Sequence, residues 1–352
     1  MPQRSLTLPV TVLVAALAAV TLAGPLAGPA SAGERAPRTD LHPRTADRGA
    51  NPRVAYYDRR SHTLHEGRHS VRVRFPGLLT QLADVRRGWV LVNQQSDPAA
   101  TTTFRFVNRL GRSRVLARTS YGHLDAVSAD GTRVAFAGAG ARRTTVLRVS
   151  DGKRATHSFH GGGRVVALGH TRALVNAGAH TVWWTPRTGL VTRYSRDQAY
   201  AADTTARRVA MLLGEGPRSY VGSFPRGSRP RWVLPDGERV GRFSVDDRHV
   251  LTLGHRRDDP GGPGYSLLRS RSTRDGLEKR TFVGELDPAQ DPRWEDPTNF
   301  LALVRRPRAH HGTVEEAWLR CTTKGRCERA SMVFALRDGR QAPVVLALQR
   351  TG

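Results

Sequence analysis

The chain has 352 residues and a formal net charge of +26, because 56 Lys and Arg face only 30 Asp and Glu. A surface of this sign attracts anionic partners over a distance, although arginines scattered over solvent-facing strands give the same total and are the plainer explanation. The sequence contains no run of five or six consecutive basic residues and no aromatic-rich RNA-binding motif, so nucleic acid is disfavoured as the partner.

The first 32 residues are predicted to be a signal peptide. Arg4 supplies a positive start, and about 14 apolar residues follow from Val10 to Ala23, fewer than the roughly 20 that a membrane-spanning helix needs. Ala30 and Ala32 are the small residues that a signal peptidase recognises. We therefore expect secretion with cleavage after Ala32. Since no second long apolar segment follows, no transmembrane segment is expected in the mature chain.

Residues 33–50 are polar, contain Pro37 and Pro43, and show no hydrophobic periodicity. Such a segment cannot bury enough apolar surface to offset the entropy of ordering it, so we expect a disordered leader. Residues 51–352 then form one folded domain. A chain of about 300 residues often contains two domains, but a repeat fold made of strands can use this length as one.

Residues 124–154 contain the clearest pattern in the chain. Apolar residues alternate with polar or small ones around Val134 and Val146, which is the period of a β-strand. Asp130-Gly131 and Asp151-Gly152 stand where the strands must reverse. Asp-Gly is the strongest short signal for a tight turn, because Gly accepts a positive φ and Asp can bond to its own backbone. The stretch therefore predicts one four-stranded antiparallel sheet.

A similar strand recurs along the chain with a period of about 41 residues. The repeated strands are Val54–Tyr57, Gly88–Val92, Arg133–Phe136, Arg172–Val175, Arg208–Leu213, Arg248–Leu253 and Phe300–Val304. We interpret each of them as the strand that opens a unit. The period is the length expected for four short strands, which is the size of one propeller blade.

The stretch Ser128-Ala-Asp-Gly131 followed by Val134-Ala-Phe136 resembles the repeat of the TolB-like, WD40-like β-propeller family, whose pattern is Ser-x-Asp-Gly-x-x-Val/Leu-Ala-Phe/Tyr. Ser244-Val-Asp-Asp247 is a second, weaker match. The Arg- and Ala-rich composition and the Cys-containing last unit also resemble exported propeller proteins of actinobacteria. The resemblance implies an all-β propeller over most of residues 51–335. It implies no activity, because members of the family share none.

Sheets of this kind have to close into a ring, because a sheet that is apolar on both faces is stable only between two neighbours. The segments Val54–Phe75 and Pro343–Leu348 are predicted to share one blade. The prediction is then a seven-bladed β-propeller of four-stranded antiparallel blades. A six-bladed ring is the alternative, if residues 51–79 only complete the last blade.

Cys321 and Cys327 flank Thr-Thr-Lys-Gly-Arg, a sequence typical of a turn. In an exported protein this spacing predicts a disulfide that joins the two arms of one hairpin. A zinc site would need two more ligands at suitable spacing, and none lies close by in the sequence.

Two short motifs match enzyme signatures only formally. His65-Glu-Gly-Arg-His69 has the spacing of a zinc-protease helix, but Gly67 and the alternating residues after it predict a hairpin turn. Asp259–Gly264 contains the Gly-Gly-Pro-Gly of some hydrolase loops, but the chain has no Gly-x-Ser-x-Gly nucleophile motif. The acidic pairs Asp246-Asp247 and Glu315-Glu316 are interpreted as turn or solvent-facing residues. No catalytic, cofactor-binding or metal-binding residue is predicted.

Two classes of function remain open. The sequence favours a monomeric, non-catalytic propeller secreted as a binding or scaffold module for a protein or for an anionic cell-envelope polymer. The alternative is an extracellular carbohydrate-active hydrolase or lyase with its site at the mouth of the central channel. Such an enzyme would place carboxylates about 5–10 Å apart at that mouth, whereas an Arg-rich rim would favour binding.

Overall fold

The computed structural model describes residues 36–95, 101–138, 142–205, 207–214, 218–224, 229–255, 265–287, 290–307, 313–337 and 342–351. The regular elements in these residues are all β-strands, as the sequence predicts. The residues from Ala36 onward group into one compact unit. No helix that could span a membrane is present in the described part of the chain. The signal peptide predicted for residues 1–32 lies outside it.

Three four-stranded antiparallel sheets follow one another in the middle of the chain, each paired in the order of the sequence. Their strands are β9 (His123–Val127), β10 (Arg133–Ala137), β11 (Arg143–Arg148), β12 (Arg154–Ser158), β13 (Gly163–Leu168), β14 (Ala173–Ala177), β15 (His180–Trp184), β16 (Val191–Ser195), β17 (Ala199–Asp203), β18 (Arg208–Leu212), β19 (Ser219–Ser223) and β20 (Trp232–Val233). Residues 124–154 thus lie in the single sheet that their alternation and Asp-Gly turns predict.

The other strands form two larger sheets, and each of these joins two neighbouring groups. The eight-stranded sheet consists of β2 (Tyr56–Asp58), β3 (Thr63–Glu66), β4 (His69–Arg72), β5 (Leu78–Val85), β6 (Gly88–Gln94), β7 (Thr101–Asn108), β8 (Ser113–Ser120) and β30 (Val344–Leu348). The ten-stranded sheet consists of β1 (Arg38–Asp40), β21 (Arg239–Phe243), β22 (His249–Gly254), β23 (Tyr265–Ser272), β24 (Glu278–Leu286), β25 (Arg293–Trp294), β26 (Asn299–Pro307), β27 (Thr313–Thr322), β28 (Cys327–Arg329) and β29 (Phe334–Arg337). With β30, β2, β3 and β4 counted as one group, the pairing of the described strands is compatible with the predicted seven groups.

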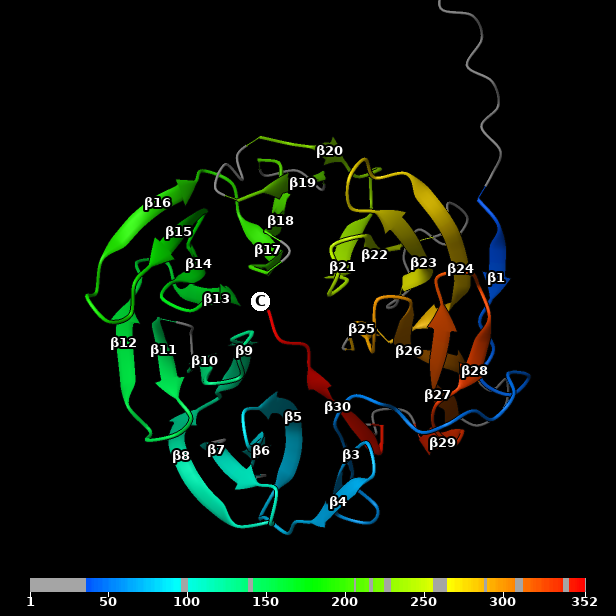
Figure 1. The fold of residues 1–352 in the computed structure, drawn as a ribbon, viewed down its shortest axis with the longest axis horizontal. Helices are drawn as coiled ribbons and strands as arrows, with labels where there is room; N and C mark the ends of the chain where they lie inside the picture. Colours follow the sequence, from blue (N-terminus) through cyan, green and yellow to red (C-terminus); the bar gives the residue numbers. More distant parts are fainter. Residues whose placement is uncertain are drawn as a thin grey trace, which may run out of the picture. The chain divides into compact units, whose positions relative to one another are not determined.

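The first and last strands of the ring share one group. β30 pairs antiparallel with β2, where Tyr57 lies opposite Val345, and it pairs parallel with β5 through Ala347 and Leu348. The sharing predicted for residues 54–75 and 343–348 is therefore confirmed. Figure 1 shows the groups arranged around a centre, with β30 next to β5.

Apolar cores lie between neighbouring groups. One core combines Val90 and Phe104 of the β5–β8 group with Leu124 and Phe136 of the β9–β12 group. The rings of Phe104 and Phe136 stack across this boundary with 4.3 Å between their centroids. Because each group contacts a neighbour on either side, both faces of its sheet are buried. This explains why β6 and β10 are apolar at almost every position and not only at alternate ones.

The strand that repeats every ~41 residues is the second of its group and not the first, which corrects the interpretation from the sequence. β10, for example, lies between β9 and β11, and β14 lies between β13 and β15. A second strand has a neighbouring strand on each side and a packed sheet on each face, so its apolar pattern is the strongest. The first strand borders the centre of the ring, and its sequence is more polar, as Asp125 and Arg164 illustrate.

Residues 36–50 are ordered, so the expectation of a disordered leader is wrong for this part of residues 33–50. β1 pairs parallel with β24, where Thr39 lies opposite Phe282, and Arg48 forms a bridge with Arg329. Leu41 is buried in the apolar core of the same sheet. Composition alone could not predict this, because the backbone partners of the segment are the edges of strands far away in the sequence.

Residues 349–351, the tail after β30, lead to the centre of the ring (Figure 1). Thr351 is only 4% exposed. Its backbone nitrogen donates to the Val127 carbonyl at 2.9 Å, and its carbonyl accepts from the Thr204 nitrogen at 3.1 Å. The Gln349 amide donates to the Phe243 carbonyl at 3.0 Å. The tail therefore connects the inner strands of three groups.

Candidate functional site

A basic groove lies on one face of the ring, at the ends of the groups β5–β8, β9–β12 and β13–β16. In a four-stranded antiparallel sheet, the turn between the first two strands and the turn between the last two lie at the same end. The turns of these three neighbouring groups therefore meet on one face. They bring residues between 86 and 187 around a single cavity of about 1210 Å³.

Basic side chains dominate the lining of this cavity. Nine Lys or Arg residues line it, together with one carboxylate, Asp130, and one imidazole, His170. The basic residues are Arg86, Arg87, Arg109, Arg114, Arg133, Arg148, Lys153, Arg154 and Arg187. We call these nine residues and the space between them the basic groove.

The Asp130-Gly131 turn at the groove is held by its own side chains. Asp130 accepts hydrogen bonds from the Ser128 hydroxyl at 2.6 Å and from the Thr132 backbone nitrogen at 3.0 Å. Gly131 has a φ of 64°, and its carbonyl accepts from the Arg86 nitrogen at 2.8 Å, which ties the β9–β10 turn to the β5–β6 turn. A Cβ at position 131 would lie 2.7 Å from that nitrogen, so the close approach of the two turns also requires Gly.

Asp130 is a charged turn residue. Its partial burial opposes ionisation, but the hydrogen bonds from Ser128 and Thr132 and the charge of Arg133 lower its pKa to about 2. A glycosidase acid needs a raised pKa and a second carboxylate at a fixed separation. Asp130 is the one carboxylate among the described residues that line the groove.

Five exposed cations of the groove make no ion pair and no side-chain hydrogen bond within the described residues. They are Arg86, Arg87, Lys153, Arg154 and Arg187. None of these five side chains forms an ion pair with a described acid. Asp151, whose pKa is lowered chiefly by a hydrogen bond from the Lys153 backbone nitrogen, also interacts with the charge of Lys153. Cations without an ion pair can bind anionic oxygens without first breaking bonds within the protein.

Two other arginines form the walls of the groove. The guanidinium of Arg109 lies 4.4 Å from the centroid of the Trp89 ring, and that of Arg114 lies 5.5 Å from the centroid of Phe106. Arg114 also donates to the Ser150 carbonyl at 2.9 Å. These contacts hold both side chains in place and leave Phe106 as part of the apolar lining.

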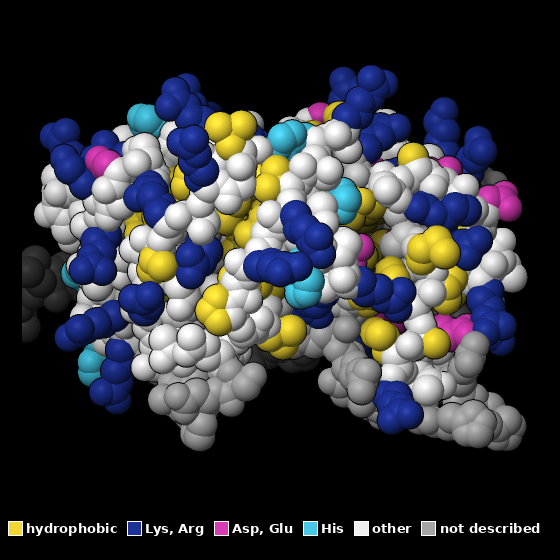
Figure 2. Space-filling model, turned by 90° about the horizontal axis from the view of Figure 1, so that it is seen from below, with side chains coloured by type: hydrophobic (Ala, Val, Ile, Leu, Met, Phe, Trp, Pro, Cys, Tyr) yellow, Lys and Arg dark blue, Asp and Glu magenta, His cyan; other side chains and the backbone are white. Residues whose placement is uncertain are grey.

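Basic side chains are not confined to the groove. Figure 2 shows Lys and Arg spread over the side of the molecule that faces the viewer, with few Asp and Glu between them. The scattering of basic side chains over the surface, which the composition indicates, is therefore present on this face (Figure 2). What distinguishes the groove is that its cations surround a cavity.

Sequence reasoning did not find the groove. Its cations are distributed over about a hundred residues, from Arg86 to Arg187, so no basic run marks them. Their common feature is position: most lie within or beside the turns that follow the first or third strand of a group. That signal becomes visible only when each strand is assigned its rank in the blade.

The motif His65–His69 forms the β3–β4 hairpin, as predicted, with Gly67 at a φ of 57° in the turn. Glu66 pairs with Arg109, and His69 Nε2 lies 2.7 Å from the Arg109 carbonyl oxygen. Both side chains therefore contact the wall of the groove. Over the described ranges, no cluster of three or more His, Cys, Asp or Glu could hold a metal ion.

Glu315 and Glu316 are 3% and 1% exposed, so the expectation that they face solvent is wrong. Glu315 pairs with Arg44 of the N-terminal segment, and Glu316 pairs with Arg305 at 2.6 Å. Burial raises the pKa of Glu316, although the charge of Arg305 opposes the shift. The sequence could not indicate the burial of Glu315 and Glu316, because the arginines that pair with them come from other elements.

The motif Asp259–Gly264 lies outside the described residues.

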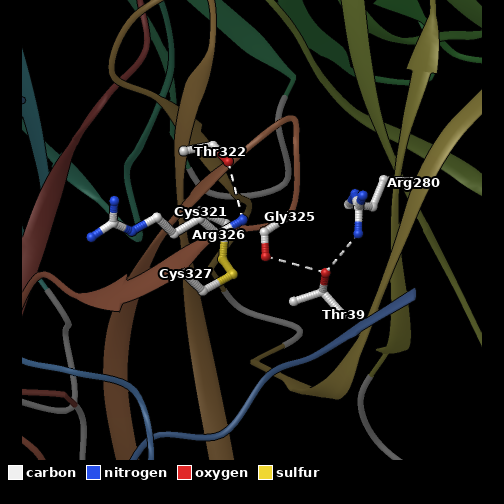
Figure 3. Close-up of a disulfide and its surroundings, with 7 residues drawn as sticks. All are labelled: Thr39, Arg280, Cys321, Thr322, Gly325, Arg326 and Cys327. Atoms are coloured by element: carbon white, nitrogen blue, oxygen red, sulfur yellow. Dashed lines mark hydrogen bonds between the residues drawn. A yellow bond between two sulfur atoms is a disulfide. The ribbon is translucent and has the colours of Figure 1, made fainter. Parts of the chain in front are cut away.

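Cys321 and Cys327 form the disulfide that the sequence predicts, and they lie opposite each other in the β27–β28 pair. Figure 3 shows the turn between them in contact with β1: the Thr39 hydroxyl donates to the Gly325 carbonyl at 3.2 Å. Arg280 of β24 donates to the same hydroxyl at 3.2 Å. The cross-linked hairpin therefore helps to hold β1 against β24.

No protein-family model matches the sequence, and no curated protein does either. Solved structures are similar in fold. A putative 6-phosphogluconolactonase from Bacteroides uniformis has a TM-score of 0.51 and 10% identity, over 80% of this chain and 92% of that chain. The Cps50 (Swd1) β-propeller domain of Myceliophteria thermophila has a TM-score of 0.45 and 10% identity, over 75% and 98%. The WD40 domain of Toxoplasma gondii coronin has a TM-score of 0.46 and 10% identity, over 84% and 78%.

At these identities the similarity concerns the fold alone. The antiparallel groups of strands, their arrangement around a centre and the pairing of the first strands with the last define the class of the protein, which is a β-propeller. Its function has to be argued from the residues of its own surface.

Proposed function

We propose that the protein is an exported propeller, built from TolB-like, WD40-like repeats, that binds an extracellular anionic polymer in the basic groove. The composition of the groove carries this proposal. Nine cations line about 1210 Å³, and Asp130, the one carboxylate among the described lining residues, already accepts hydrogen bonds within its own turn. Like charges in a hollow with low-dielectric walls reinforce one another, so the groove concentrates anions more strongly than the same charges on a convex surface.

The distribution of the groove cations favours a polymer over a small ion. Its five unpaired cations are contributed by all three groups of strands, so a ligand needs several anionic positions to contact them together. The planar guanidinium groups bind phosphate, sulfate or carboxylate oxygens in pairs. Phe106 and Val149 add apolar surface between the charges. An anionic cell-envelope polymer has these properties, and an acidic protein is the next partner to consider.

The extracellular location is part of the proposal. It is supported by the signal-peptide pattern of residues 1–32 and by the Cys321–Cys327 disulfide, since such bonds persist mainly in oxidising compartments. The protein would act as a monomer after cleavage behind Ala32.

The alternative of a carbohydrate-active hydrolase or lyase has less support. Its chemistry needs two carboxylates at a fixed separation, and the described lining of the groove contributes Asp130 alone. The likeness to a putative lactonase is a likeness of fold and brings no residues with it.

The proposal is tested by titrating the mature protein with dextran sulfate and with neutral dextran. In one variant the five unpaired groove cations are changed to Gln. The substitutions are R86Q, R87Q, K153Q, R154Q and R187Q. We expect the affinity for dextran sulfate to fall about tenfold or more, equivalent to roughly 1.4 kcal/mol, because the cations that contact the polymer are gone. We expect no binding of neutral dextran by either protein.

A control variant removes the same charge elsewhere on the ring. Its substitutions are R118Q, R142Q, R143Q, R196Q and R337Q, all at exposed positions outside the groove. We expect it to keep its affinity within about twofold and to show the same weakening with added salt as the unaltered protein. If both variants lose affinity equally, or if binding does not respond to salt, the groove is not the binding site.

A further inference from the structure

Four arginines gather around one carboxylate near the centre of the ring. They are Arg164 of β13, Arg239 and Arg242 of β21, and Arg293 of β25, and these strands lie among those closest to the centre in Figure 1. The carboxylate is Asp291, whose side chain is about one third exposed, at 36%. It lies 3.4 Å from Arg239 Nη2 and 3.5 Å from Arg242 Nη2. One carboxylate therefore forms ion pairs with more than one arginine.

The pKa of Asp291 shows that the four arginines lie close enough to interact with its carboxylate. Burial would raise its pKa, but the charges of Arg242, Arg293, Arg239 and Arg164 keep the pKa below its usual value. The carboxylate is therefore ionised at neutral pH. Counted together, the four arginines and Asp291 carry a net charge of about +3 (four cations and one anion).

Arg293 is the least satisfied member of this cluster. Only 6% of the residue is exposed. Burial lowers its pKa to about 9, the charge of Arg242 acts in the same direction, and Asp291 opposes both. The guanidinium thus keeps its charge at neutral pH. Its Nε and Nη1 atoms are buried and make no hydrogen bond with any residue that the structure describes.

Unused donors are not limited to Arg293. The Nε atoms of Arg239 and Arg242 are also buried, with no hydrogen-bond partner in the described ranges. Buried N–H groups of a cation that lack acceptors are unfavourable, because they have lost their water, and the charge of Asp291 offsets only part of this cost for Arg293. A guanidinium has five N–H donors in a rigid fork, which fits an anion with two or more oxygens. Beyond Asp291, the described residues therefore supply no acceptor for these N–H groups.

We propose that the cluster is a binding site for a small oxyanion, a phosphate or a carboxylate group, held by Arg293 together with Arg239 and Arg242. The anion would accept from the unused N–H groups and reduce the excess positive charge beside Asp291. This site is separate from the basic groove. Its three arginines belong to β21 and β25, whereas the groove is formed by β5–β16.

The test measures binding of inorganic phosphate and of acetate to the mature protein by calorimetry. The two anions distinguish a phosphate ligand from a carboxylate ligand. We expect saturable binding of at least one of them, at one site per chain. In Arg293→Gln the affinity should fall at least about tenfold, because the buried fork is lost. The groove variant Arg154→Gln is the matched control and should bind the small anion as the unaltered protein does.

A second measurement separates a ligand-binding role from a structural one. In buffer without phosphate or carboxylate, Arg293→Met should unfold at the same temperature as the unaltered protein or at a higher one, because it removes a buried cation whose Nε and Nη1 lack acceptors among the described residues. The bound anion should raise the unfolding temperature of the unaltered protein and not that of Arg293→Met.

Three results would overturn the proposal. The first is the absence of saturable binding of both anions. The second is unchanged affinity in Arg293→Gln, whatever the affinity of Arg154→Gln. The third is a lower unfolding temperature of Arg293→Met in anion-free buffer, which would make Arg293 a structural cation. If Arg293→Gln does not fold, Arg239→Gln, whose side chain is 40% exposed, takes its place in the binding measurement with the same expected loss.

Discussion

Asp130 illustrates what single residues contribute to this protein. Its carboxylate accepts from Ser128 and Thr132, and the hydroxyl of Thr132 donates to it as well, at 2.9 Å. Ser244 and Asp246 repeat the same contact in the β21–β22 turn, at 2.7 Å. The Ser-x-Asp pattern is therefore explained by local chemistry: the acid closes the turn that leads into the second strand.

The depressed pKa of Asp130 predicts an acid-dependent contribution to stability. A group whose pKa is lower in the folded than in the unfolded chain stabilises the fold above its unfolded pKa, and this contribution is lost as the pH falls through the folded value. For Asp130 these values are 3.8 and about 2. We therefore expect the difference in unfolding free energy between the unaltered protein and Asp130→Ala to be constant above about pH 5 and to shrink towards pH 2. Denaturant titrations over this range measure it, and a difference that does not change with pH would contradict the assignment.

At the scale of elements, the ordered N-terminal segment and the last hairpin depend on each other. β1 lies along β24, and the disulfide-linked turn of β27–β28 contacts Thr39. Arg320 of β27, only 5% exposed, donates to the carbonyls of Ala50 and Asn51 at 3.1 and 2.8 Å. These contacts hold the N-terminal segment, which is too polar to form a core of its own.

Removal of the disulfide should weaken this region. The bond closes a loop with a sequence separation of 6, and chain-entropy estimates for so short a loop give about 2 kcal/mol. We expect the double variant C321A/C327A to lose about this much free energy of unfolding in denaturant titrations. A reducing agent should lower the stability of the unaltered protein to the same level and leave the variant unchanged. Equal stability of the two proteins under oxidising conditions would show that the bond contributes nothing.

At the scale of the whole ring, closure rests on two features. β30 pairs with β2 and β5, and the tail that follows connects inner strands at the centre. Within this tail, the Thr351 hydroxyl accepts from the Leu168 nitrogen at 3.1 Å and donates to the Val127 carbonyl at 3.0 Å. One residue therefore satisfies buried backbone groups from several blades.

Truncation after Leu348 should destabilise the ring. It would leave the nitrogens of Leu168 and Thr204 without their acceptors, at a cost of about 1–3 kcal/mol each. We expect the free energy of unfolding to fall by about 2–5 kcal/mol in denaturant titrations. Thr351→Val, which removes only the hydroxyl, serves as the comparison and should cost about 1–3 kcal/mol. A truncated chain as stable as the full one would mean that closure rests on β30 alone.

The fold was predictable to the extent that its signals are local. The Asp130-Gly131 turn, the β3–β4 hairpin around Gly67 and the Cys321–Cys327 pair all depend on residues close together in the sequence. Their geometry follows from φ preferences and from short loops, which a sequence displays directly. The period of about 41 residues reflects one blade after another and is visible for the same reason.

Other features depend on residues brought together by the ring. Glu315 is buried because Arg44 reaches it from a segment that composition alone assigns to disorder. The cations of the basic groove and the arginines around Asp291 come from separate blades, and no short stretch of the chain shows either cluster. Alternation and turn residues act between near neighbours, so the chain alone reveals its strands and their repeat. Charges act across space, so only the closed ring reveals where they meet.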